Sequence, residues 1–225
     1  MESEGRKLHG LAAEARERGE HLESLKLSDE ALLAYGEEGN DLGFSEVLAD
    51  RSIVFRHLNE EKNDKKFLYL ARAEMTEAVR IARESGKPEA IALPVYQLGN
   101  VEEDLGNFPE AIKHYGEAVD NYKDDRPAYL ATIKVHLTTC QYKNGDKSAL
   151  DRAIQALTEI EASDEEKYNK DVWCSGGHMR LADMLKGDDP KEAKEHLQKA
   201  KDIIDSNLDL KLRAKQWEKL AATFN

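Results

Sequence analysis

Cysteine, long apolar runs and excess positive charge are all scarce in this sequence, and each scarcity excludes a class of protein. There are two cysteines, Cys140 and Cys174, and no C-x-x-C spacing, so a disulfide framework is excluded and a reducing compartment is favoured. No stretch approaches the roughly 20 apolar residues of a membrane span. The opening residues, MESEGRKLHG, lack the uninterrupted apolar region of a secretory signal. We therefore expect a cytoplasmic protein with no membrane partner.

Negative charge dominates the composition. Lysine and arginine number 33 against 45 aspartates and glutamates, which gives a net charge of -12. Such a field repels phosphate backbones, because nucleic-acid binding needs a basic surface that releases counterions. Nucleic acid is therefore not an expected partner, and a protein with a basic patch is favoured. The two signs of charge are interleaved along the chain, which predicts solvated helix faces rather than a charged tail.

Proline and glycine are few, at five and 14 residues, and they mark the ends of helices. Between them, apolar residues such as Leu98, Val101 and Leu105 recur every three or four positions, which predicts amphipathic helices and no strands. Helix starts are predicted at Pro88, Pro109, Pro127 and Pro190, and left-handed helix ends at Gly19, Gly106, Gly145 and Gly187. The eleven predicted helices span 3–18, 21–36, 42–58, 64–85, 88–105, 108–123, 126–144, 147–162, 165–186, 190–206 and 209–224.

A repeat of about 40 residues pairs these helices into hairpins. In each second helix, a small or apolar residue precedes another by seven positions: Ser24 and Ala31, Ala71 and Ala78, Ala111 and Ala118, Ala153 and Ile160, Ala193 and Ala200. Small side chains let two helices approach closely, and stacking completes the core that one hairpin cannot form. We expect one all-α repeat domain over 1–225, with units near 3–40, 41–87, 88–125, 126–163 and 164–207 and a cap at 208–225.

The last segment, LDLKLRAKQWEKLAATF, is suited to cover the end of such a stack. Its apolar residues form one helix face: Leu210, Ala214, Trp217, Ala221 and Phe224. Lysine and glutamate remain on the other side, so we expect a solvating capping helix.

The third unit resembles a known repeat. Residues 95–119, VYQLGNVEEDLGNFPEAIKHYGEAV, are similar to a tetratricopeptide repeat (TPR), whose pattern runs W-x2-L-G-x2-Y, then A-x3-F and a small residue. The first helix supplies Gly99, and the second supplies Ala111, Tyr115 and Ala118. The resemblance implies a right-handed superhelical solenoid of about five antiparallel helix hairpins plus the C-terminal capping helix.

The other units are more divergent copies. The first unit, for example, places Ser28 where the third has Tyr115. The period also exceeds the roughly 34 residues of the TPR family, so HEAT-like hairpins are the rival interpretation.

The TPR resemblance implies that the first helix of each hairpin lines a concave groove for an extended peptide or a partner helix. The register places seven residues there: Tyr96, Gln97, Asn100, Val135, His136, Thr139 and His178. Gly177 would share the face of His178. The amides, hydroxyl and aromatic ring suit hydrogen bonding to a peptide backbone. The opposing interpretation is that each one is an ordinary polar residue of a first helix.

Metal chemistry has little support in the sequence. His57 with Glu60, and His114 with Glu117, have the i, i+3 spacing of residues on one helix face. Zinc needs three or four convergent ligands, however, and no H-E-x-x-H motif occurs. We expect no metal site and no cofactor.

Catalytic chemistry has equally little support. Cys140 and Cys174 are expected to be buried as small hydrophobic residues. The SGGH sequence at 175–178 predicts close helix packing or a local break, because a phosphate loop needs more glycine and a lysine at defined spacing. No catalytic residue is predicted.

These observations favour a monomeric, non-enzymatic protein-protein interaction scaffold that binds a peptide or a partner protein. Two alternatives stay open. A structural, self-assembling repeat module would leave an apolar end of the stack uncovered. A helical enzyme or small-ligand sensor would contain a closed polar pocket with perturbed titrating groups.

Overall fold

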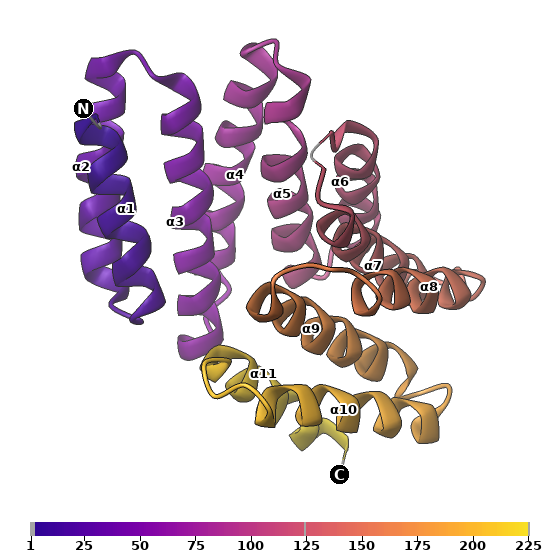
Figure 1. The fold of residues 1–225 in the computed structure, drawn as a ribbon. Coiled ribbons are helices and arrows are strands. Elements are labelled where there is room, and N and C mark those ends of the chain that lie inside the picture. Colours follow the sequence, from indigo (N-terminus) through magenta and orange to yellow (C-terminus); the bar gives the residue numbers. More distant parts are fainter. Residues whose placement is uncertain (1–2, 124, 225) are drawn as a thin grey trace. The chain divides into compact units, whose positions relative to one another are not determined.

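The computed structural model describes residues 3–123 and 125–224, and the regular backbone in these ranges is helical. Eleven α-helices follow one another in the described chain, as predicted (Figure 1). They are α1 (Glu4–Glu17), α2 (His21–Glu38), α3 (Asp41–Lys62), α4 (Lys66–Glu84), α5 (Ala92–Asp104), α6 (Phe108–Asn121), α7 (Pro127–Lys143), α8 (Ala149–Glu161), α9 (Lys167–Leu185), α10 (Pro190–Asp205) and α11 (Lys211–Ala221). Two 3-10 helices are η1 (Pro88–Ala90) and η2 (Ala222–Phe224). None of the helices described has both the length and the apolar character that crossing a membrane requires.

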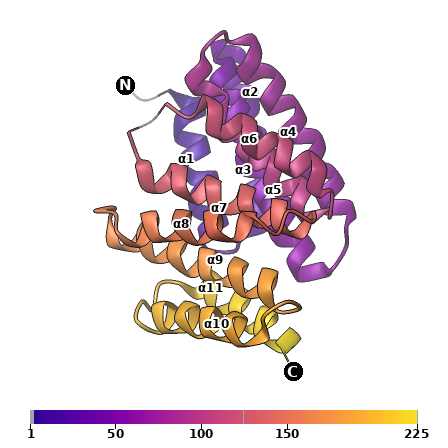
Figure 2. The same cartoon turned by 90° about the vertical axis from the view of Figure 1, so that its right-hand side faces the viewer.

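The chain divides into two compact units, Met1–Tyr122 and Lys123–Asn225. In the first unit the hairpins are α1/α2, α3/α4 and α5/α6, with α3 packed on α2 and α5 packed on α4. In the second unit the hairpins are α7/α8 and α9/α10. Helix α9 contacts both α7 and α8, and α11 lies against α9 and α10 (Figure 2). Consecutive helices therefore pack in pairs, and the pairs stack within each unit.

Prolines begin helices largely as predicted. Three lie in the first turn of a helix, where the missing N–H costs little: Pro109 in α6, Pro127 in α7 and Pro190 in α10. Pro88 instead opens the 3-10 turn η1, so α5 begins at Ala92 rather than at residue 88. The helix predicted to stop at residue 58 continues to Lys62 and ends on Asn63, whose φ is 51°.

Left-handed residues end several helices. The predicted glycines with positive φ are Gly19, Gly106 and Gly145. Gly187 has no left-handed backbone, so that prediction was wrong. The reason is local: the amides of Asp188 and Asp189 both return to the carbonyl of Leu185, at 3.0 and 2.8 Å, and close the turn around Gly187.

The predicted small positions are points of close helix packing. Ser24 is 2% exposed, and the other nine residues of the seven-residue pairs are 0% exposed. Hydroxyl groups bridge the same contacts. Ser24 Oγ donates to the carbonyl of Ala12 across α1/α2 at 2.9 Å, and Ser45 Oγ donates to that of Ala78 across α3/α4 at 3.0 Å. Side chains this short bring a partner's backbone within hydrogen-bonding reach.

Aromatic rings packed against glycine are a second packing device in the first unit. Tyr35 of α2 lies between α1 and α3, where a Cβ atom at Gly5 or Gly43 would come within 2.5 Å of its ring. Tyr115 of α6 packs in the same way against Gly99 of α5, where the corresponding distance is 2.6 Å. No other residue type fits at these glycines while the ring stays in place.

Ser28 has the place in α2 that Tyr115 has in α6, but it has no ring to pack against a glycine. The Ser28 hydroxyl donates to the Ser24 carbonyl of its own helix at 2.7 Å, and Tyr35 supplies the ring. Ala31 and Tyr35 have the spacing A-x3-Y that also occurs in the third unit, and this spacing could have identified Tyr35 as the packed ring.

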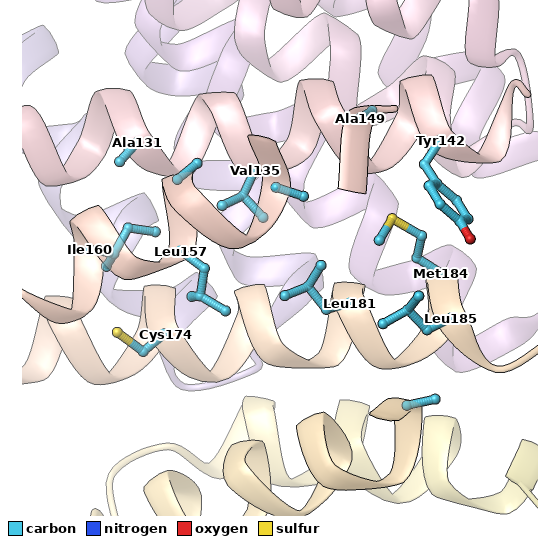
Figure 3. Packing of buried hydrophobic residues seen from close by; sticks show 13 residues of the cluster. Ala131, Val135, Tyr142, Ala149, Leu157, Ile160, Cys174, Leu181, Met184 and Leu185 are labelled. Atoms are coloured by element: carbon cyan, nitrogen blue, oxygen red, sulfur yellow. The ribbon is translucent and has the colours of Figure 1, made fainter. Parts of the chain in front are cut away.

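Aliphatic side chains form the core of the second unit (Figure 3). Leu157 of α8 packs against Gly177 of α9, where a Cβ atom would lie 2.7 Å from the Leu157 side chain. Ile160 and Leu181 are each 0% exposed in the same cluster. Phe224, predicted for the apolar face of the cap, packs against this cluster as well.

We expect Ala118→Leu to lower the free energy of unfolding by about 2 kcal/mol, because three added carbons at a fully enclosed position force α6 away from the helices packed against it. Gly116→Ala is the matched control on α6, since its new Cβ atom would meet nothing within 4 Å. It should leave stability unchanged or raise it slightly. Urea denaturation followed by circular dichroism measures both, and a wild-type midpoint for Ala118→Leu would contradict the close packing.

Candidate protein-interaction surface

The first helices of the three hairpins in the first unit, α1, α3 and α5, are joined by ion pairs. Arg6 of α1 meets Glu46 of α3 at 3.2 Å, with both side chains more than half exposed. Arg56 of α3 meets Asp104 of α5 at 2.6 Å, where both side chains are largely covered. These ion pairs link neighbouring hairpins and leave polar groups along the row of first helices.

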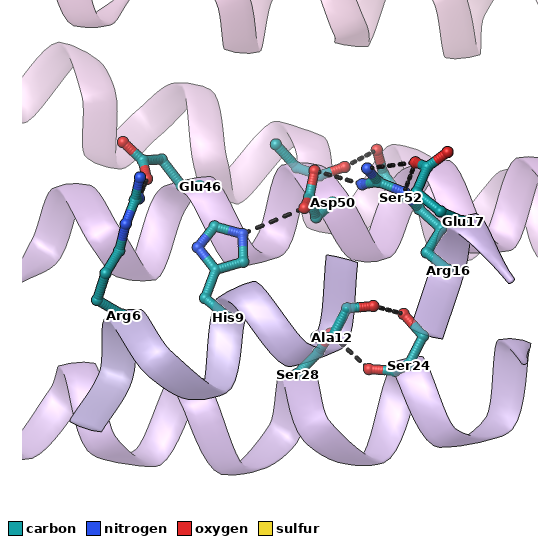
Figure 4. Close-up of polar contacts among 11 residues, drawn as sticks. Arg6, His9, Ala12, Arg16, Glu17, Ser24, Ser28, Glu46, Asp50 and Ser52 are labelled. Carbon is teal, nitrogen blue, oxygen red and sulfur yellow. Dashed lines mark hydrogen bonds and ion pairs between the residues drawn. The ribbon is translucent and has the colours of Figure 1, made fainter. Parts of the chain in front are cut away.

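Asp50 is the centre of the most enclosed contact between α1 and α3 (Figure 4). One of its oxygens lies 3.2 Å from His9 Nε2, and the other lies 2.7 Å from Arg16 Nη1. Burial alone would raise the pKa of Asp50, but the His9 hydrogen bond and the Arg16 charge outweigh it and hold the pKa below its usual value. The carboxylate therefore stays ionised and ties α1 to α3 at neutral pH.

Three predicted groove residues lie together on α5. Asn100 is 4% exposed and Tyr96 is 6% exposed, while Gln97 is half-buried. The Tyr115 hydroxyl lies 2.8 Å from Asn100 Oδ1, and Asn100 Nδ2 donates to Gln97 Oε1 at 3.0 Å. The amide of Asn100 is thus engaged within the unit, and Gln97 is the residue of the three that reaches solvent most readily.

The predicted residues of α7 are placed differently. Val135 is 1% exposed and belongs to the hydrophobic core of the second unit, so its assignment to a groove was wrong. Thr139 is 0% exposed, and its hydroxyl donates to the Val135 carbonyl at 2.8 Å, so this side chain serves its own helix. His136 is half-buried and stays a prediction.

His178 of α9 is an interior residue rather than a groove residue, because it is 3% exposed. Its Nε2 lies 2.9 Å from Glu161 Oε1 on α8, and its Nδ1 lies 2.9 Å from His196 Nδ1 on α10. Since a carboxylate only accepts, the Nε2–H of His178 donates to Glu161, and the Nδ1–H of His196 donates to His178. Gly177, predicted beside it, faces Leu157 in the core.

Burial and the neighbouring His196 lower the pKa of His178 to about 3. Burial also lowers the pKa of His196. Both rings are therefore neutral at physiological pH, and together with Glu161 they form a hydrogen-bonded chain across α8, α9 and α10. Helical periodicity did not predict that His178 lies in the interior, because α9 is packed against several neighbours and has no single apolar stripe.

The cysteines, Cys140 on α7 and Cys174 on α9, are buried, as predicted, and are not joined in a disulfide. Burial and the negative charge of Glu161 raise the pKa of Cys174 to about 11, so its thiol stays protonated. His57 is also desolvated, and burial followed by the charge of Arg56 lowers its pKa to about 4. Within the part of the chain that the structure describes, no three His, Cys, Asp or Glu side chains are grouped to hold a metal ion.

We expect Asp50→Asn to lower the free energy of unfolding by about 2 kcal/mol, since it leaves the largely covered Arg16 with only the exposed Glu17 as a counter-charge. Glu46→Gln, which breaks the exposed pair with Arg6, is the matched control and should cost less than about 0.5 kcal/mol. Urea denaturation compares the two variants, and equal losses would show that the Asp50 contact is no stronger than a surface pair.

The buried His178 also predicts a pH dependence of stability. Its folded pKa of about 3 lies below its unfolded value, so the unfolded chain binds the proton first and stability falls as the pH is lowered from about 6.5 towards 3. Between these pH values the wild type should take up about one proton at His178 when it unfolds, and His178→Gln should lack this uptake. Chemical denaturation at a series of pH values measures the uptake, and an unchanged slope would contradict the assignment. His136→Gln serves as the control.

No family model matches the sequence, and no curated protein matches it. Solved structures do match. BtubC from P. vanneervenii is 18% identical, with 88% of this chain and 79% of that chain covered and a TM-score of 0.66. A putative kinesin light chain from Podosopora anserina with nearly identical TPR-like repeats is 14% identical, with coverage of 89% and 94% and a TM-score of 0.63.

A third similar structure is a Rap protein complexed with Competence and Sporulation Factor. It is 13% identical and has a TM-score of 0.64, and the match covers 100% of this chain and 66% of that chain. At such low identities the likeness concerns the fold alone. The paired helices, the repeated small positions and these matches together identify the fold of the chain as a TPR-like helical repeat.

Proposed function

We propose that this protein is a non-enzymatic interaction scaffold that binds a peptide segment or a partner protein along its first helices. The TPR-like fold over nearly the whole chain carries the proposal, because stacked hairpins present rows of side chains for recognition. A protein of similar fold has been captured in complex with Competence and Sporulation Factor, which supports a partner of this kind. We place the scaffold in the cytoplasm.

Of the seven predicted groove residues, Gln97 on α5 and His136 on α7 are half-buried and the other five are buried, so these two are the proposed contact residues. The two units differ in net charge. Residues 1–122 contain 26 aspartates and glutamates against 15 lysines and arginines, whereas residues 123–225 contain 19 against 18. A partner with a basic segment would therefore be attracted mainly to the first unit, where the field also speeds its association.

A binding role also agrees with the state of the reactive side chains. The thiol of Cys174 is protonated at neutral pH, and His178 is neutral and engaged at both ring nitrogens. Neither group resembles an activated nucleophile or a general base within reach of a substrate. That the two units form one continuous repeat domain, and that the protein is monomeric, stay predictions.

The double substitution Gln97→Ala with His136→Ala should reduce partner retention at least tenfold when the full chain is immobilised and exposed to extract from its native host. The control is Lys113→Ala on the second helix α6, an exposed residue of the unit that contains Gln97. Retention should also fall with rising ionic strength, because the attraction is partly electrostatic. Quantitative mass spectrometry of the retained proteins reads out each comparison.

If the same proteins are retained by the double variant while its helical signal is unchanged, the first helices are not the binding surface. If retention is insensitive to salt, the basic-segment preference is wrong. Sedimentation of the free protein over a range of concentrations tests the self-assembling alternative, which requires a mass that rises with concentration.

A further inference from the structure

Helix α11 is held more loosely than the rest of the second unit. Among the α-helices that the structure describes, it is the one with no buried residue. Its neighbour α10, by comparison, buries five residues, including Leu197 and Ile204. Helices with little burial open at a small free-energy cost, so the surface beneath α11 is transiently uncovered.

A specific set of contacts nevertheless positions α11. Trp217 Nε1 donates to the carbonyl of Leu197 on α10 at 2.8 Å, and the ammonium group of Lys201 lies 5.3 Å from the centre of the Trp217 ring. Leu210, just before the helix, is 3% exposed. Phe224, just after α11, packs against the hydrophobic core of the second unit. The segment is therefore held by a few separate side chains rather than by a continuous buried stripe along α11.

Arg213 of α11 is a further contact, and it lies against Gly176 on α9. The atoms nearest to a Cβ at this glycine belong to the Arg213 guanidinium group, at 3.3 and 3.4 Å. Two adjacent glycines inside a helix cost roughly 1 kcal/mol each in helix propensity. Gly177 is required by Leu157, and Gly176 leaves the space in which Arg213 lies.

These contacts define the α11 docking surface: Gly176 on α9, and Leu197, Lys201 and Ile204 on α10. The packing over it is incomplete. A small pocket remains between α10 and α11, lined by Lys201, Ile204, Asp205, Ala214, Trp217 and Glu218.

The occupant of this surface has a definite chemistry. Arg213 and Trp217 are four residues apart and share one face of α11, while Lys211, Lys215 and Lys219 are exposed on the other. With Glu218 as its single acidic residue, α11 is a basic amphipathic helix. The part of the second unit before it, residues 123–210, contains 18 aspartates and glutamates against 14 lysines and arginines. Charge complementarity thus favours a basic helix over an acidic one at this surface.

We propose that the α11 docking surface is a second binding site, which accepts a basic amphipathic helix of a partner protein carrying an arginine and a tryptophan four residues apart. In the free protein α11 occupies the site and competes with that helix. Binding shifts the equilibrium towards chains whose own α11 has detached. This site contains neither Gln97 nor His136, the contact residues proposed for the first helices.

The test uses a fluorescently labelled synthetic peptide with the sequence of residues 207–224, titrated into the full-length protein and followed by anisotropy. Trp217→Ala in the protein should tighten peptide binding at least tenfold, because its own α11 has lost its anchor and competes less. Lys219→Ala, on the exposed side of α11, is the matched control and should bind the peptide as the wild type does. A peptide with alanine in place of its tryptophan should bind neither protein.

Equal peptide affinity of the wild type and Trp217→Ala would overturn the proposal, as would binding that does not need the peptide's tryptophan. Hydrogen exchange of the wild type tests it without any substitution: amides of α11 should exchange at least tenfold faster than those of α10, and equal protection would overturn it. Sedimentation tests whether a second copy of this chain, rather than a partner protein, fills the surface. A wild-type dimer that exchanges α11 between copies would mean that a second copy fills the surface, and not a partner.

Discussion

Close approach between neighbouring helices is the constraint on which the structure depends. Two helices can come within hydrogen-bonding reach of each other's backbone only where one of them has a very short side chain. Tyr35 illustrates the limit, because its ring occupies space that a Cβ atom at Gly5 or Gly43 would need. Leu157 and Gly177 repeat the arrangement in the second unit with an aliphatic side chain. Each hairpin can therefore pack against the next at one separation and in one register.

That register decides which polar residues remain for a partner. The first helices pack on several sides, so groups that resemble binding residues in the sequence are often engaged internally. Asp50 bridges α1 and α3 through His9 and Arg16. His178 links Glu161 to His196 in the interior of the second unit. Such buried polar chains favour one arrangement of helices, because a displaced partner would leave its hydrogen bonds unmade.

The two units have different physical characters. The first carries nearly all of the net negative charge, so long-range attraction acts there. The second is close to neutral and ends in a basic helix held mainly by Trp217. Under the two proposals made above, charge would attract one partner to the first unit, and displacement of α11 would make the second unit selective for shape. The stacked hairpins supply rigidity to both.

Helix number, hairpin pairing and the small contact positions were all predictable from the sequence, because helical periodicity and residues such as Ala118 and Pro190 act through local geometry. The exposed side of each first helix was not predictable from the sequence. Val135, Thr139 and His178 have the spacing of groove residues, yet neighbouring helices enclose them. Burial on several faces erases the apolar stripe by which a sequence reveals its exposed side. Tyr35 and Gly43 belong to different hairpins, and only the stacking of those hairpins brings the ring to the glycine.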